Sequence, residues 1–87
     1  MSQNNEDLKN KIIYRASYRG TKEMDILMID FIKSIIDKFD KDKLQVLDEF
    51  VNMDDEILKS IRNKEAFLNI KDKIFLEIVD RFQKHPL

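Results

Sequence analysis

Charged side chains gather around the only glycine of the chain, Gly20. Arg19 precedes it, and Glu23 and Asp25 follow it. Residues two apart point to different sides of a helix, so Glu23 and Asp25 do not form a ready acid and base couple or a metal-binding pair. Both carboxylates would lie in or just after the first turn of the second predicted helix, where the helix dipole favours negative charge. From the residues alone, helix capping and solvated charge are therefore the favoured interpretation of this cluster.

Residues that could carry out catalysis elsewhere are sparse. The only histidine, His85, lies beside Pro86 in a segment, 84–87, that we expect to be frayed, and the chain has no cysteine. A single glycine cannot form a glycine-rich phosphate cradle. We expect no enzyme activity, no metal and no cofactor of its own. The aromatic and methionine positions are expected in the core, among them Met24, Met28, Phe31, Phe39 and Phe50.

The charge balance argues against nucleic acid as a partner. The chain has 16 basic and 17 acidic residues and a net charge of -1. Lysines alternate with acids, as in Lys41-Asp42-Lys43, which is typical of a solvated helix surface and not of a basic phosphate-binding face.

No apolar run approaches the roughly 18 residues that span a membrane, so we expect no membrane insertion. Asp25, Asp30 and Lys33 interrupt the best candidate. The first residues, 1–7, are polar and acidic and resemble neither a secretion signal nor a mitochondrial transit sequence. These features favour the bacterial cytoplasm.

Apolar spacing predicts an all-α fold, a small single-domain bundle of about five short helices over residues 1–87. The helices are expected at 6–18, 22–39, 42–52, 54–63 and 70–84, with 1–5 disordered. Gly20 would form the junction of the first two helices and Thr21 would cap the second. The later caps are expected at Asp40 or Asp42, at Asn52 or Asp54, and at Asn69 with Asp72 three residues on. Buried positions expected on the fourth helix are Ile57, Leu58 and Ile61.

The string from Arg19 to Asp25 resembles the succinate dehydrogenase assembly factor 2 family, the small helical flavinylation factors of bacteria and mitochondria. That family carries an Arg-Gly-x-x-Glu core, often extended in bacteria to Arg-Gly-Thr-x-Glu-Met-Asp and an apolar helix, and both are present here. Tyr14-Arg15 fits the upstream aromatic and arginine. The resemblance covers residues 8 to 62, although the tryptophan that is frequent in the second half of the family is absent from this chain.

The resemblance implies an assembly factor that binds the flavoprotein subunit of succinate dehydrogenase, and sometimes that of fumarate reductase. It would promote covalent attachment of FAD to a histidine of this client, so FAD would be met only through the client protein. The implied partner-binding residues are Arg19, Gly20 and Glu23, with Arg15, Asp25, Tyr14 and Tyr18 as their rim.

Two alternatives remain open from the residues alone. Glu23 could have a purely local role in a salt bridge and in capping the second helix. The chain could also be a helical regulatory or antitoxin-like protein that sequesters a different protein partner through the same surface.

Overall fold

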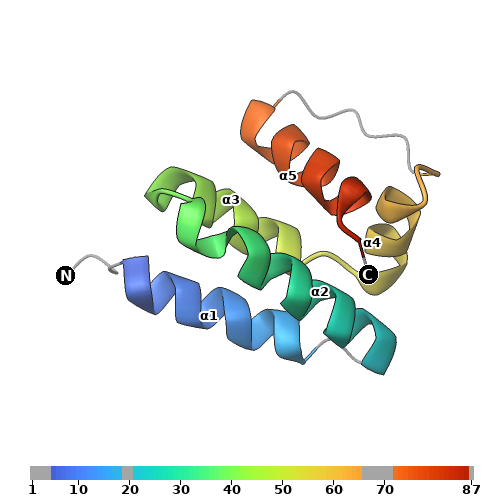
Figure 1. Ribbon diagram of the computed structural model, residues 1–87, viewed down its shortest axis with the longest axis horizontal. Coiled ribbons are helices and arrows are strands. Elements are labelled where there is room, and N and C mark those ends of the chain that lie inside the picture. Colours follow the sequence, from blue (N-terminus) through green and yellow to red (C-terminus); the bar gives the residue numbers. More distant parts are fainter. Residues whose placement is uncertain (1–4, 19–20, 66–71, 87) are drawn as a thin grey trace.

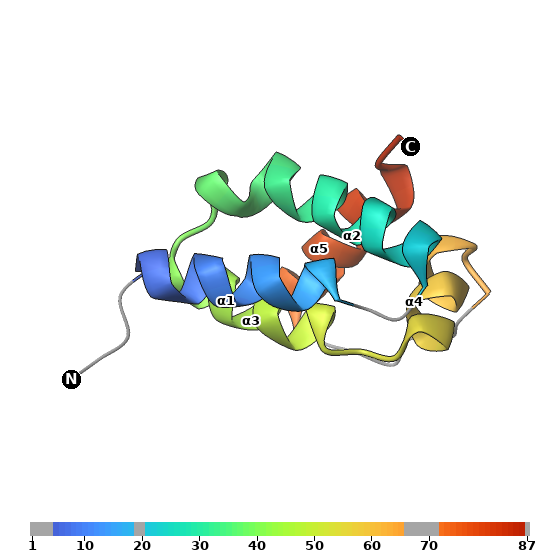
Figure 2. The same cartoon turned by 90° about the horizontal axis from the view of Figure 1, so that it is seen from below.

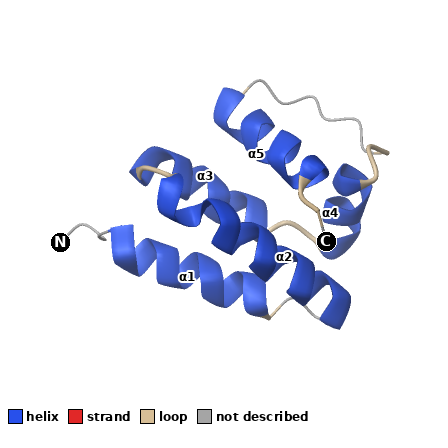
Figure 3. Cartoon of the chain, viewed as in Figure 1, coloured by secondary structure: helices blue, strands red, loops and turns tan. Residues whose placement is uncertain are grey.

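The computed structural model describes residues 5–18, 21–65 and 72–86, and these ranges form an all-α fold without strands (Figures 1 and 3). The helices in chain order are α1 (Asn5–Ser17), α2 (Lys22–Ile35), the 3₁₀ helix η1 (Ile36–Lys38), α3 (Lys41–Val51), α4 (Asp55–Arg62) and α5 (Lys73–Lys84). The prediction of an all-α bundle of about five helices is confirmed. The bounds of α1, α3 and α4 agree with the predicted bounds to within one residue. The segment expected to be disordered, 1–5, lies outside the described residues except for Asn5, which begins α1.

The beginning of each later helix follows from its cap. The Thr21 hydroxyl accepts a hydrogen bond from the backbone N–H of Met24 at 3.3 Å, as predicted for α2. Asp40, and not Asp42, caps α3, and Asp54 occupies the cap position of α4 without a side-chain bond. The predicted start of α5 at residue 70 is wrong, because the Asp72 carboxylate itself caps the helix, which begins at Lys73. Asn69 lies outside the described residues.

The second helix ends earlier than its apolar spacing predicts, because its last turn tightens. The α-helical part stops at Ile35, and η1 continues to Lys38 instead of extending the α-helix to residue 39. Ile36 begins this 3₁₀ turn and Phe39 follows it with an extended backbone. Both side chains are buried in the core together with that of Ile35.

The main contacts between α-helices join two pairs that are neighbours in the sequence and two pairs that are separated by one other α-helix. α1 contacts both α2 and α3, and α5 contacts both α3 and α4. Figure 2, seen from below, shows α2 lying over α1 and α3, with α5 behind them. The end of α1 and the beginning of α2 therefore meet at one end of this three-helix unit.

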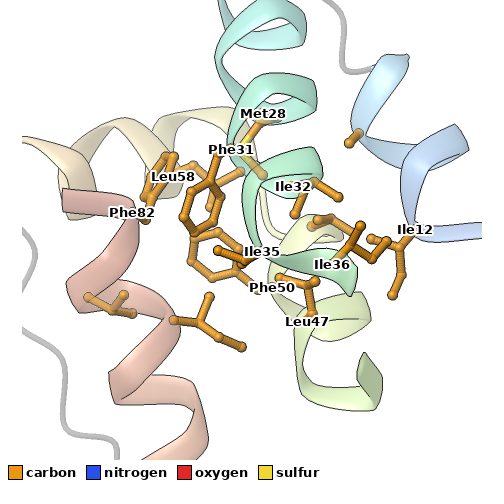
Figure 4. Packing of buried hydrophobic residues seen from close by; sticks show 14 of the residues in the cluster. Ile12, Met28, Phe31, Ile32, Ile35, Ile36, Leu47, Phe50, Leu58 and Phe82 are labelled. Atoms are coloured by element: carbon orange, nitrogen blue, oxygen red, sulfur yellow. The ribbon is translucent and has the colours of Figure 1, made fainter. Parts of the chain in front are cut away.

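Aromatic rings fill the centre of the core (Figure 4). The ring of Phe82 on α5 lies 5.1 Å from that of Phe31 on α2 and 5.2 Å from that of Phe50 on α3. Such offset and edge-on aromatic pairs add to the stabilisation that burial of their area provides. On α4, Leu58 and Ile61 are buried as predicted, but Ile57 is 42% exposed, because this short helix buries only one narrow stripe.

Of the tail expected to be frayed, Lys84 ends α5, His85 and Pro86 follow it, and Leu87 lies outside the described residues. Nε2 of His85 lies 2.7 Å from Oδ2 of Asp30 on α2, and the His85 ring packs edge-on against Phe31. Arg62 at the end of α4 donates hydrogen bonds to the backbone carbonyls of Phe82 and His85. These bonds satisfy carbonyls that a helix end leaves open, so they fasten α5 to α4.

Candidate partner-binding surface at the α1–α2 hairpin

The predicted site residues that the structure describes come from the last turn of α1, from Tyr18 directly after it, and from the first turn of α2. We call this set, Tyr14, Arg15, Tyr18, Glu23 and Asp25, the hairpin surface. Arg19 and Gly20, the other two predicted site residues, lie outside the described residues. The structure therefore brings the flanks of the motif to one end of the α1–α2 hairpin (Figure 1).

Two tyrosines form an exposed aromatic pair on this surface. Tyr14 is 66% and Tyr18 is 73% exposed, and their ring centroids lie 4.8 Å apart. The pair follows from helical spacing, because side chains four residues apart share a face. Tyrosine offers a large, rigid contact area with few rotatable bonds and a polar hydroxyl at its edge. The pair is therefore well suited to contact another protein.

Arg15 points to the neighbouring helix α3. Its Nη1 atom lies 3.0 Å from Oδ1 of Asp48, and Nζ of Lys11 lies 3.6 Å from Oδ2 of the same carboxylate. The Asp48 side chain is only 17% exposed, whereas that of Arg15 is 37% exposed. Sequence reasoning missed Asp48, because helical spacing carries no signal for a partner 33 residues away. The arginine thus has an intramolecular role in holding α1 against α3.

Glu23 is exposed in the first turn of α2, and its carboxylate makes no hydrogen bond or ion pair with any side chain of the described ranges. The cap is supplied by Thr21, through the N–H of Met24, so Glu23 is not needed to bind a free backbone donor. Its remaining local contribution is the favourable interaction of a negative charge with the N-terminal end of the helix. Asp25 is half-buried, and its backbone N–H donates to the Thr21 carbonyl at 2.9 Å.

Ile26 extends the hairpin surface along α2. It is 51% exposed and lies three residues after Glu23, so the two side chains share a face of the helix. The signal was available in the sequence, because Ile26 is out of phase with the buried stripe that contains Met24, Met28 and Phe31. An apolar side chain beside an exposed carboxylate is typical of a mixed contact surface.

The described part of the chain holds neither a metal-binding cluster nor a helix that could span a membrane. No group of three or more histidine, aspartate or glutamate side chains there could hold a metal ion. No helix among the described residues is long and apolar enough to cross a membrane.

Comparison with known proteins identifies the family. The family model described as "Flavinator of succinate dehydrogenase" matches residues 10–86, which include the whole motif from Arg19 to Asp25 and all of α5. The match therefore extends beyond the region, 8 to 62, over which the sequence shows its resemblance. No curated protein and no solved structure matches the chain. With nearly the whole sequence covered by the family model, the chain belongs to the family of flavinators of succinate dehydrogenase.

Proposed function

We propose that this protein binds the flavoprotein subunit of succinate dehydrogenase through the hairpin surface and promotes covalent attachment of FAD to that subunit. The observation that carries the proposal is the exposed pair Tyr14 and Tyr18, which lies beside the motif in a chain of the flavinator family. Large aromatic side chains left in solvent favour protein recognition.

In this proposal the protein orients the reacting groups of its client, the flavoprotein subunit, and supplies no reacting atom itself. In the proposed reaction the bond forms between a histidine of the client and the flavin of FAD, so the reacting groups belong to the client and its cofactor. A helper that stabilises the client conformation in which these groups face each other raises the population of reactive geometry. Correct alignment of two bound groups can lower a barrier by several kcal/mol. On this proposal the chain is an assembly factor and not an enzyme.

The motif residues have separate roles in this contact. Arg19 binds a carboxylate or carbonyls of the client through its guanidinium, and Gly20 allows the client to approach the backbone closely. Glu23 accepts hydrogen bonds from the client, because its carboxylate has no partner within the described part of the chain. Tyr14 and Tyr18 supply the apolar contact area, and Asp25 and Ile26 complete the rim of the surface.

Covalent flavin on the client tests the proposal directly in cells. The succinate dehydrogenase flavoprotein is taken from cells that lack the gene and carry wild type, Glu23→Ala or Glu56→Ala, and its flavin fluorescence is recorded in a denaturing gel. Glu56 is the matched control, an exposed glutamate in the first turn of α4. Loss of a charge-assisted hydrogen bond costs about 1.5–3 kcal/mol, or roughly tenfold or more in affinity. The fluorescent band should be strong with wild type and Glu56→Ala and weak with Glu23→Ala.

Equal bands for all three variants and for the empty strain would contradict the proposal. The flavoprotein of fumarate reductase can be followed in the same gel, and we propose that it depends on the same surface. A band lost from succinate dehydrogenase alone would restrict the client to that enzyme.

A further inference from the structure

One carboxylate on α3 holds two cations of α1 that lie one helical turn apart. Asp48 accepts from Arg15 at 3.0 Å through Oδ1, and its Oδ2 lies 3.6 Å from Nζ of Lys11. The carboxylate is largely buried between the two helices, with 17% of its side chain exposed. A planar guanidinium bound to a fixed oxygen constrains direction as well as distance. This arrangement is an interhelical clamp on the last turns of α1.

The end of α1 has little else to fix its orientation. Its buried residues are Leu8, Ile12 and Ala16, so the last large apolar anchor is Ile12 and the last turn is anchored only by the methyl group of Ala16. Ile13 is only partly buried against the core. A small side chain buries little area and therefore resists rotation of the helix only weakly. The Arg15 clamp acts at the turn where these apolar contacts become small.

We propose that Asp48 is a positioning residue for partner binding. By gripping Arg15 it fixes the rotation of the last turn of α1, and this rotation aims Tyr14 and Tyr18 at the partner. Arg15, although it is one of the predicted site residues, then acts through its ion pair with Asp48 instead of contacting the partner itself. The inference rests on the proposed function, because the partner in question is the flavoprotein subunit.

The chain offers a matched control for the loss of an interhelical clamp. Glu77 on α5 also accepts two cations, Lys43 of α3 at 3.3 Å and Arg81 of α5 at 3.5 Å. It joins α5 to α3 and contacts no residue of the hairpin surface in the described part of the chain. Glu77→Gln therefore removes a comparable clamp from another helix pair.

The first test measures two quantities for each variant. One is its affinity for the purified flavoprotein subunit, by titration calorimetry, and the other is the thermal midpoint of unfolding of the free chain. Asp48→Asn should weaken binding roughly tenfold, a factor typical of coupling between contacting residues, while Glu77→Gln stays within about twofold of wild type. Both variants should remain folded at the temperature of the titration. If Asp48→Asn binds as tightly as Glu77→Gln, the inference is wrong.

A charge exchange separates positioning from direct contact. Arg15→Glu and Asp48→Arg should each weaken binding, and the double variant should recover most of the wild-type affinity, because the clamp is rebuilt with its charges exchanged. Lys11 is 41% exposed and can turn into solvent away from the new arginine. If Arg15 contacts the partner itself, the double variant will bind as weakly as Arg15→Glu, and the positioning role is overturned.

A measurement on the free chain keeps the inference distinct from the proposed function. The backbone amide NMR shifts of Tyr14 and Tyr18 should move in Asp48→Asn and return toward wild type in the charge-exchanged double variant. Unchanged shifts would overturn the positioning role whether or not the flavoprotein binds. Absence of binding by wild type, with the shifts changing as expected, would instead count against the proposed function and leave the clamp supported.

Discussion

The ring centroids of Tyr14, in the last turn of α1, and Tyr18, directly after that helix, lie 4.8 Å apart, so this end of α1 presents an aromatic pair to a partner. Both rings are mostly exposed, and their removal therefore creates no cavity in the core.

Truncation of this pair should affect binding and not folding. Tyr14→Ala and Tyr18→Ala should each weaken binding of the flavoprotein subunit by on the order of 1–2 kcal/mol, because aromatic side chains dominate many protein interfaces. Leu76→Ala, at an exposed apolar position of α5, is the control. Calorimetric titration and circular dichroism of the same samples give both readouts. Equal affinities for the three variants would exclude the aromatic pair from the interface.

Truncation of an aromatic side chain in the core should destabilise the fold. Phe82 is fully buried and packs against both Phe31 and Phe50, so Phe82→Ala should cost about 3–5 kcal/mol of stability. That is a large share of the roughly 5–15 kcal/mol that stabilises a typical domain. Urea unfolding followed by circular dichroism measures the loss. A stability close to that of Ile57→Ala, which alters an exposed position of α4, would contradict the packing of the core.

Arg62 should be one of the most important polar residues for stability. It donates to the carbonyls of Phe82 and His85, and its guanidinium lies over the Phe82 ring. Arg62→Ala should destabilise the fold by about 1.5–3 kcal/mol, the range for hydrogen bonds to charged groups. Arg81→Ala breaks only an exposed pair with Glu77 and should cost less than about 0.5 kcal/mol. The free energy of unfolding of both variants is measured by chemical denaturation. Equal losses of stability would show that the role assigned to Arg62 is wrong.

The cap of α2 should be replaceable by a similar hydroxyl. Thr21→Ala should lower stability by about 1 kcal/mol, since the N–H of Met24 loses its side-chain acceptor, and Thr21→Ser should retain most of that stability. Thermal unfolding of both variants gives the comparison. A serine variant as unstable as the alanine variant would show that the hydroxyl does not cap the helix.

Local patterns in the sequence were sufficient to predict the helices and much of the core. The apolar period of 3.6 residues marks the buried stripes, and side chains such as Thr21 and Asp40 bind donors only three residues away. The exceptions have local causes as well. The last turn of α2 tightens into η1, and Asp72 caps α5 directly instead of standing inside it.

Contacts between distant segments could not be predicted in the same way. Asp48 on α3 binds Arg15 on α1, which is 33 residues away in the sequence, and His85 binds Asp30, which is 55 residues away. No rule of helical spacing connects residues so far apart. Tyr14 and Glu23 match the family pattern, Tyr18 belongs to the predicted rim of the binding surface, and the roles of all three residues in binding stay predictions. The structure adds that Arg15 already has a partner within the chain.

Flavinylation with purified components tests the central claim most directly. The flavoprotein subunit of succinate dehydrogenase, free of covalent flavin, is mixed with FAD alone, with FAD and wild-type chain, or with FAD and Glu23→Ala, and covalent flavin is followed by in-gel fluorescence over time. The account predicts fast accumulation with wild type and slow accumulation in the other two mixtures. Equal rates in all three mixtures would contradict it.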